Sequence, residues 1–250
     1  MSKTMIDLEN PLISVITVVY NAAQTLEPTM LSVINQTYKN VEYIIIDGGS
    51  TDGTVDIIKK YEDKIAYWVS ESDKGIYDAM NKGIDRATGE WINFMNAGDS
   101  FATQDVLCTV FERGHYNDID IIYGNVYLIG QKKVGKIGNL NRIKYYMPFC
   151  HQSCFVRTKL SKNRPFNIAY KIASDYDFFC DMFYKKHKFH HVNEIISLYD
   201  ESGLSSLNGK ETEIEYKKIR GPLRNLRYKC IFFLHGIRVL LKTTKKLLIL

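Results

Sequence analysis

The regular alternation of strand-like and helix-like segments through the first hundred residues constrains the fold most. The run "LISVITVVY" at 12–20 is rich in β-branched residues, which suit a strand that is buried on both faces. Three more strands are predicted at 41–47, 65–71 and 90–96, with helices between them at 25–36, 51–63 and 75–89. This order predicts an α/β fold in which right-handed crossovers join parallel strands.

The pattern is looser after Phe101. We expect a hairpin over 120–138, a strand at 150–158, a helix at 174–186 and a strand at 190–200. A chain of 250 residues that is 45% hydrophobic can bury one large core, so we expect a single catalytic body.

Polar and acidic residues follow all four predicted parallel strands. They are Tyr20 and Asn21, then Asp47, then Glu71 and Asp73, and finally Asn96 and Asp99. Ligands of open parallel sheets bind outside the carboxyl ends of the strands, so these residues predict a site at one acidic edge.

A nucleotide diphosphate would be repelled by that edge unless Mg²⁺ or Mn²⁺ lay between them. Asp99 is the best-placed metal ligand, because a strand fixes its position and Gly98 leaves room for close approach. Spacing alone supports equally well the alternative that Asp99 caps a helix starting near Thr103.

The sequence argues against two classes of nucleotide-binding protein, the dinucleotide-binding dehydrogenases and the P-loop proteins. A dinucleotide fingerprint needs glycines after the first strand, where this chain has "YNAAQT", and there is no P-loop lysine. The turn "DGGSTDGT" either contacts phosphate through backbone N–H groups or is only a tight connection.

The end of the chain is strongly basic. From Tyr216 to Leu250 there are ten Lys or Arg and no acid, which leaves 23 bases against 28 acids before that point. Because these bases alternate with apolar runs, we favour amphipathic helices on a membrane surface over a helix that packs on the body. No apolar run approaches the roughly 20 residues of a membrane span, and the interleaving argues against nucleic acid.

The cysteines and the first residues indicate a reduced, cytoplasmic protein. The five cysteines lack regular spacing, and the first ten residues lack the apolar core of a signal peptide. Zinc at Cys150, His151 and Cys154 is disfavoured because a second ligand pair is missing.

Two stretches carry a family resemblance. "ISVITVVYNAAQTLEPTMLSVINQTYKNVEYIIIDGGSTDGT" and "DKGIYDAMNKGIDRATGEWINFMNAGD" resemble the first half of family 2 glycosyltransferases. "HQSCFVR" and "SDYDFF" match that family more loosely. The resemblance implies the A-type glycosyltransferase fold, with a Rossmann-like, mostly parallel sheet, a nucleotide-sugar donor and transfer with inversion.

The resemblance also implies which residues bind the donor. Position by position, the nucleotide-binding residues are Thr17, Tyr20, Asn21, Asp47, Asp73 and Asn96. "NAGD" corresponds to the family's D-x-D-D region, with Asp99 kept as the metal ligand for Mg²⁺ or Mn²⁺. Asn96 and Gly98 replace two of the usual acids, and Asn96 can still offer a carbonyl oxygen.

The acceptor side is implied in the same way. Ser174 and Asp175 resemble the family's acidic helix start, which makes Asp175 the general base and Asp177 the runner-up. The alternative is that Ser174 and Asp175 only cap a helix. His151 and Gln152 resemble a segment beside the site that touches donor phosphate or acceptor.

We therefore expect a glycosyltransferase at the inner face of the cell membrane. It would move a sugar from a nucleotide donor, with a UDP-sugar favoured, to a glycan or lipid-linked acceptor in surface polysaccharide biosynthesis. Residues 1–215 would form the catalytic domain, divided into a nucleotide half (1–100) and an acceptor half (101–215), and 216–250 the basic amphipathic segment. The alternatives are a nucleotidyltransferase and a non-catalytic module that binds nucleotide sugar or glycan.

Overall fold

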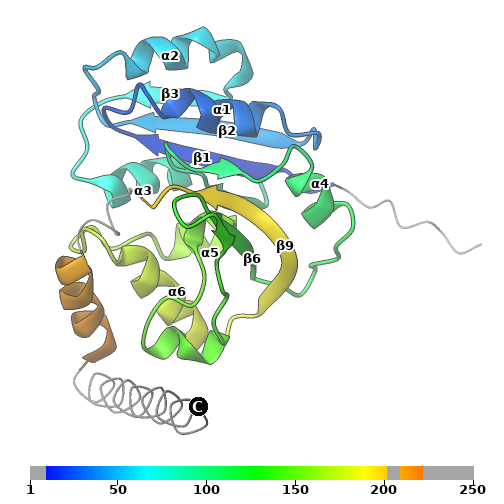
Figure 1. Cartoon of the computed structure of the whole chain (residues 1–250), viewed down its shortest axis with the longest axis vertical. Coiled ribbons are helices and arrows are strands. Elements are labelled where there is room, and N and C mark those ends of the chain that lie inside the picture. Colours follow the sequence, from blue (N-terminus) through cyan, green and yellow to red (C-terminus); the bar gives the residue numbers. More distant parts are fainter. Residues whose placement is uncertain (1–9, 202–208, 222–250) are drawn as a thin grey trace, which may run out of the picture.

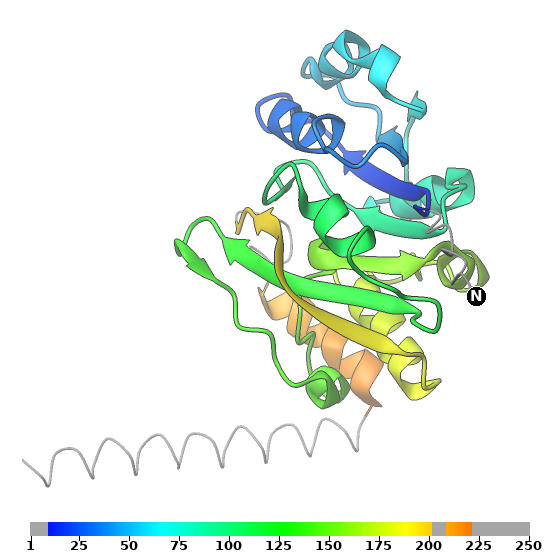
Figure 2. The same cartoon turned by 90° about the vertical axis from the view of Figure 1, so that its right-hand side faces the viewer.

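The computed structural model describes residues 10–201 and 209–221 (Figure 1). Within these residues the strands form one nine-stranded mixed sheet in the order β3-β2-β1-β4-β8-β6-β9-β5, with β7 paired to β6. Helices cover both faces of this curled sheet (Figures 1 and 2). The predicted α/β class is confirmed, and the sheet that was expected to be mostly parallel is mixed, with parallel pairs throughout its first half.

The first half is the predicted set of parallel strands. Its strands are β1 (Ile13–Val19), β2 (Val41–Asp47), β3 (Tyr67–Ser70) and β4 (Trp91–Phe94). Between them lie α1 (Leu26–Ile34), α2 (Thr54–Lys60), the 3₁₀ turn η1 (Glu62–Lys64) and α3 (Ile76–Arg86). The helix predicted at 75–89 is shorter in the structure, because α3 ends at Arg86 with Ala87 as its C-cap.

Strand β1 is buried at every position because helices cover both of its faces. Ile16 and Val18 pack with the core that includes α3, whereas Val15 and Val19 pack with the core that includes α1. In the parallel register Val19 lies beside Asp47, so the carboxyl ends of β1 and β2 meet at the same edge.

The second half extends the sheet with antiparallel and parallel pairs. Its strands are β5 (Ser100–Phe101), β6 (Ile121–Leu128), β7 (Lys133–Val134), β8 (Cys154–Arg157) and β9 (Phe189–Tyr199). Strand β8 joins the halves by pairing antiparallel with β4 and β6, and the predicted β6–β7 hairpin is confirmed. The long strand β9 curves along β6 (Figure 1).

The helices of the second half are short, except for the predicted one. They are α4 (Val106–Phe111), α5 (Thr158–Asn163) and α6 (Ser174–Tyr184), with the 3₁₀ turns η2 (Leu140–Lys144) and η3 (His151–Ser153). Turn η3 and the start of α6 carry three of the expected site residues.

A further helix at 209–221 lies beside α6 (Figure 2). The Tyr216 ring stacks on Tyr176 with 4.1 Å between centroids, and the Glu215 carboxylate accepts three backbone N–H groups from 171–173. This helix crosses the boundary expected at 215/216, and residues 222–250 lie outside the described residues. In the described ranges, no helix has the length and apolar character that crossing a bilayer requires.

Candidate active site

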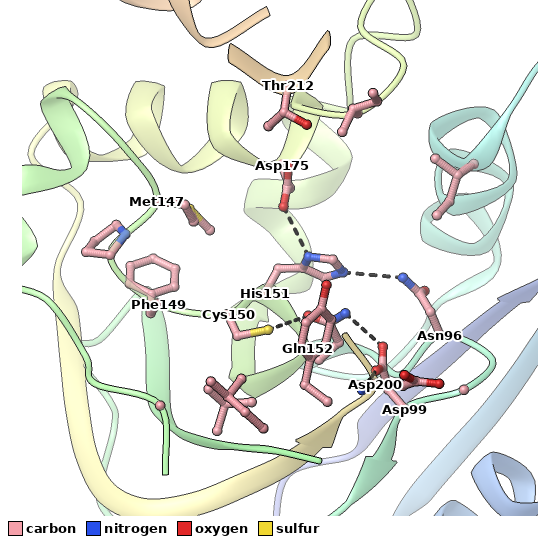
Figure 3. Close-up of a pocket in the computed structure, with 18 of the residues that line it drawn as sticks. Asn96, Asp99, Met147, Phe149, Cys150, His151, Gln152, Asp175, Asp200 and Thr212 are labelled. Atoms are coloured by element: carbon pink, nitrogen blue, oxygen red, sulfur yellow. Dashed lines mark hydrogen bonds and ion pairs between the residues drawn. The ribbon is translucent and has the colours of Figure 1, made fainter. Parts of the chain in front are cut away.

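A cavity of about 600 Å³ lies where the two halves of the sheet meet. The loop after β4, strand β6, the segment 147–152, the start of α6 and the end of β9 all contribute to its lining (Figure 3). Five residues singled out in the sequence line it together: Asn96, Asp99, His151, Gln152 and Asp175.

Asp99 is held at the cavity by a fixed loop. Gly98 has a φ of +100°, a left-handed conformation that favours glycine. Its N–H donates to the Thr29 hydroxyl over 3.1 Å, and that hydroxyl donates to the Asp99 carbonyl over 2.6 Å. The Asp99 carboxylate accepts from Gln152 Nε2 at 2.8 Å and from the Asp200 backbone N–H at 3.0 Å.

Burial disfavours the ionised form of Asp99. Its side chain is buried, and burial raises its pKa to about 6 despite the hydrogen bonds from the Asp200 N–H and Gln152. The helix-cap alternative does not hold, because α4 begins at Val106 with Asp105 as its N-cap.

Gln152 is oriented from its other end by Cys150. The Cys150 thiol donates to Gln152 Oε1 over 2.7 Å, which leaves the amide N–H for Asp99. Burial raises the pKa of the Cys150 thiol, so the thiol stays protonated and remains a donor.

A chain of hydrogen bonds joins Asn96, His151 and Asp175 (Figure 3). Asn96 Nδ2 lies 3.3 Å from His151 Nε2, and His151 Nδ1 lies 3.1 Å from Asp175 Oδ2. An ionised carboxylate only accepts and an amide N–H₂ only donates, so this chain needs a neutral ring with its proton on Nδ1. Asn96 Oδ1 is buried and has no hydrogen-bond partner in the described part of the chain.

Hydrogen bonds keep the Asp175 carboxylate ionised. Burial by itself would raise the pKa of its carboxyl. The hydrogen bonds from His151, the Tyr176 N–H and the Tyr77 hydroxyl outweigh burial and hold that pKa below its ordinary value. The carboxylate is therefore ionised at neutral pH, with its side chain 16% exposed at the cavity.

Asp177, the runner-up, is engaged elsewhere. Its carboxylate forms an ion pair with Arg164 at 2.6 Å and is absent from the cavity lining. The cap of α6 is Ala173, and no side chain makes a capping hydrogen bond there. Capping therefore does not account for the acidic start of α6.

Two of the expected nucleotide-binding residues lie in the core. Thr17 is fully buried, and its hydroxyl donates to the Met95 carbonyl. Asp47 is also fully buried and accepts from the N–H groups of Gly49 and Ser50, which fixes the turn after β2. Neither residue presents an exposed side chain to a ligand in this structure.

Three others gather at the strand ends. Tyr20 is 65% exposed, and Asn21 is exposed with a φ of +47°. A Cβ on Gly48 would lie 2.5 Å from Asp73 Oδ2 and 3.3 Å from Tyr20 Cδ2, so glycine makes room for both side chains. Tyr20, Asn21 and Asp73 are not among the residues that line the cavity described above.

The sequence reasoning missed Asp200 and Tyr77. Asp200 follows β9 and lines the cavity, and its backbone N–H contacts Asp99. The same signal that singled out Asp47, an acid that ends a predicted strand, was present in "SLYD". Tyr77 carried no such signal, because its contact with Asp175 joins residues 98 positions apart.

The zinc alternative has no support in the structure. The Cys154 thiol donates to the Cys150 carbonyl, and both ring nitrogens of His151 are engaged. Across 10–201 and 209–221, no three His, Cys, Asp or Glu side chains are grouped as a metal site. A Mg²⁺ or Mn²⁺ site needs fewer protein ligands than a zinc site, because one or two carboxylates are completed by phosphate oxygens and water.

Solved structures share this fold. S. aureus TarS 1–349 in complex with UDP-GlcNAc has a TM-score of 0.64 at 18% identity, over 78% of this chain and 60% of that one. The mannosyltransferase PcManGT from Pyrobaculum calidifontis, in complex with GDP-Man and Mn²⁺, has a TM-score of 0.58 at 17% identity, over 76% and 57%. The match to a longer TarS chain spans 36% of that chain.

Sequence comparison identifies the family. A PGL/p-HBAD biosynthesis glycosyltransferase of Mycobacterium bovis is 34% identical over 174 residues, which are 67% of this chain and 68% of the relative. An uncharacterized glycosyltransferase of Haemophilus influenzae is 36% identical over 118 residues, 46% of this chain and 47% of the relative. Residues 14–187 match the model of glycosyl transferase family 2. The chain therefore belongs to glycosyl transferase family 2 and is a glycosyltransferase with the A-type fold.

Proposed function

We propose that this glycosyltransferase moves a sugar, with inversion, from a UDP-sugar to a hydroxyl of a glycan or lipid-linked acceptor in surface polysaccharide biosynthesis. One observation carries the proposal: Asn96 and Asp99 face the same cavity as the ionised Asp175, with His151 between them (Figure 3). The fold shared with TarS, solved with UDP-GlcNAc, supports this class of donor.

The nucleotide would bind across the carboxyl ends of β1–β3. The exposed ring of Tyr20 offers an apolar face for a base, and Asn21 and Asp73 offer polar groups for base and ribose. Thr17 and Asp47 would act from beneath, because Asp47 fixes the turn on which a ribose would rest.

The residues present fit a divalent cation. Asp99 supplies a carboxylate, and because burial disfavours its ionised form, a bound cation would offset that cost. Asn96 supplies a buried oxygen that has no hydrogen-bond partner in the described residues. These two side chains would hold Mg²⁺ or Mn²⁺, and PcManGT, solved with Mn²⁺, shares the fold. When bound, the ion would offset the negative charge that develops on the departing nucleoside diphosphate.

Asp175 would act as the general base. It takes the proton of the acceptor hydroxyl while that oxygen bonds to the anomeric carbon. The bond from that carbon to the diphosphate oxygen breaks on the opposite face, which inverts the configuration. His151 acts through Asp175, because its Nδ1–H holds the carboxylate in place.

Release of the nucleoside diphosphate tests the proposal. Each UDP-sugar of a panel is incubated with Mn²⁺ and mixed acceptors, and UDP is measured for wild type, Asp99→Asn, Asp175→Asn and Asp177→Asn. We expect both Asp99→Asn and Asp175→Asn to lose at least a hundredfold in turnover with an unchanged circular dichroism spectrum. Asp177→Asn should remain active, because its partner Arg164 lies outside the cavity lining.

Three outcomes would contradict this reading. Wild-type turnover in both Asp99→Asn and Asp175→Asn would remove the proposed chemistry from the cavity. Release of inorganic pyrophosphate from nucleotide substrates would favour a nucleotidyltransferase. Failure of folded wild type to release UDP from any donor would favour a binding module.

We place the protein at the cytoplasmic face of the membrane, on the basis of the basic segment 216–250. The enzyme would then meet a lipid-linked acceptor at the surface where such acceptors are held.

A further inference from the structure

The cavity has two chemically different sides. Figure 3 shows Asn96 and Asp99 on one side of His151, and Met147 and Phe149 on the other. The second side, called here the apolar wall, is built by β6 and the segments 135–137 and 147–149. Its apolar side chains are Val126, Leu128, Ile137, Met147, Pro148 and Phe149. The only polar side chain that these described segments add to the lining is Lys136.

Close packing holds the apolar wall in place. A Cβ on Gly135 would lie 2.8 Å from Val126 Cγ1, and a Cβ on Gly138 would lie 3.1 Å from Pro148 Cβ. The two glycines let the segment after β7 lie directly against β6 and against 147–149. The wall is therefore part of the packed body.

Some backbone N–H and C=O groups at the apolar wall are already hydrogen-bonded to one another. Gly135 N–H donates to the Val126 carbonyl over 2.8 Å, and Gly138 N–H donates to the Pro148 carbonyl over 2.8 Å. Sugar hydroxyls placed against this wall would lose hydrogen bonds to water and find few replacements. An apolar group would instead leave water for a matching surface.

The position of the apolar wall connects it with the acceptor. If Asp175 is the base of the proposed function, the hydroxyl that attacks must lie beside it, in the same cavity that the apolar wall lines. We infer that the acceptor carries an apolar group, an alkyl or aryl aglycone, close to the hydroxyl that receives the sugar. This inference rests on the proposed function and narrows its acceptor to amphipathic molecules.

Acceptor series test the inference. The acceptors are methyl, butyl, hexyl and octyl glycosides of common monosaccharides, kept below their micelle concentrations, and the matching phenyl glycosides. We expect KM to fall about three- to fourfold for each methylene that reaches the apolar wall, since burying a CH₂ contributes about 0.8 kcal/mol and 1.4 kcal/mol is tenfold. The phenyl arm distinguishes an aryl from an alkyl aglycone.

Leu128, the last residue of β6, and the next residue, Ile129, give a matched control. Leu128 lines the cavity, whereas Ile129 is 45% exposed and does not. Leu128→Asn should weaken the dependence of KM on chain length at least fivefold between butyl and octyl acceptors, and Ile129→Asn should leave it unchanged. Met147→Gln, nearly equal in shape, gives a second test if Leu128→Asn folds poorly.

The readouts separate this inference from the proposed function. UDP binding in the presence of Mn²⁺ is measured by thermal shift for every variant and should be the same in all. Turnover with a KM that does not depend on chain length, or equal effects of Leu128→Asn, Met147→Gln and Ile129→Asn, would overturn the apolar acceptor alone. Absence of UDP binding and of turnover in wild type would overturn both.

Discussion

His151 links the two chemical halves of the site, and each of its ring nitrogens can be tested alone. Nδ1 donates to Asp175 and Nε2 accepts from Asn96. Asparagine places an amide nitrogen near the position of Nδ1, and glutamine places its amide near the position of Nε2. His151→Asn therefore keeps the link to Asp175, and His151→Gln keeps the link to Asn96.

The structure sets the size of each effect. Both side chains of the His151–Asp175 pair are mostly buried, 21% and 16% exposed, so solvent screens their hydrogen bond little. A hydrogen bond to a charged group contributes about 1.5–3 kcal/mol, which corresponds to roughly 10- to 150-fold in kcat for His151→Gln. The neutral bond to Asn96 contributes about 0.5–1.5 kcal/mol, or roughly 2- to 12-fold in donor KM for His151→Asn.

The assay is steady-state UDP release with donor and acceptor varied separately. His151→Gln should lower kcat with donor KM nearly unchanged, His151→Asn should raise donor KM with kcat nearly unchanged, and His151→Ala should do both. His187 forms the same contact with Asp120, Nδ1 to Oδ2 at 3.1 Å, outside the cavity lining. His187→Asn and His187→Gln are therefore matched controls and should leave both constants unchanged.

The reasoning fails if His151→Asn and His151→Gln have the same kcat and the same donor KM while both remain folded. It also fails if His151→Gln turns over at the wild-type rate, because Asp175 would then not need the Nδ1–H.

Three further predictions concern Asp175, Gly48 and the basic segment 222–250. The folded pKa of Asp175 is held below its ordinary 3.8, so its ionised form adds stability above that pH and loses it as pH falls through the folded value. The Tm difference between wild type and Asp175→Asn should therefore narrow only below about pH 4, and narrowing near pH 6 would contradict the assignment. Gly48→Ala would place a Cβ 2.5 Å from Asp73 Oδ2, so UDP affinity in calorimetry should fall about tenfold or more, with kcat kept at saturating donor. Removal of 222–250, which contain seven Lys or Arg, should abolish flotation with anionic vesicles and leave turnover on water-soluble acceptors intact, whereas flotation without this segment would refute its role.

The sequence predicted the first half of the fold well. Strand β2 was predicted with the boundaries observed, Val41–Asp47, because a run of buried β-branched residues ends abruptly at a carboxylate. The helices between these strands carry clear apolar faces, and their signals are local.

The missed elements depend on distant contacts. Strand β5 has two residues and exists because Ser100 and Phe101 pair with Leu198 and Ser197 of β9. Helices α4 and α5 have six residues each, too few for a helical period to stand out from the background, and α4 was expected only in the alternative of a helix near Thr103.

Only part of the candidate site could be predicted from the sequence. Asp99 and Asp175 each stood at the end of a predicted element, but the link through His151 joins three segments that only the tertiary fold brings together. Thr17 shows a second limit of prediction from the sequence. A strand that is apolar at nearly every position does not reveal which side chains face a ligand and which face the core.

Calorimetric titration of UDP, with and without Mn²⁺, into wild type, Asp99→Asn and Asp175→Asn tests the central claim most directly. That claim is that one cavity holds the diphosphate side at Asp99 and the base at Asp175. Wild type should bind UDP more tightly with Mn²⁺, Asp99→Asn should lose that gain by at least tenfold, and Asp175→Asn should keep it while catalysing no transfer. Wild-type Mn²⁺-dependent binding by Asp99→Asn would contradict the account.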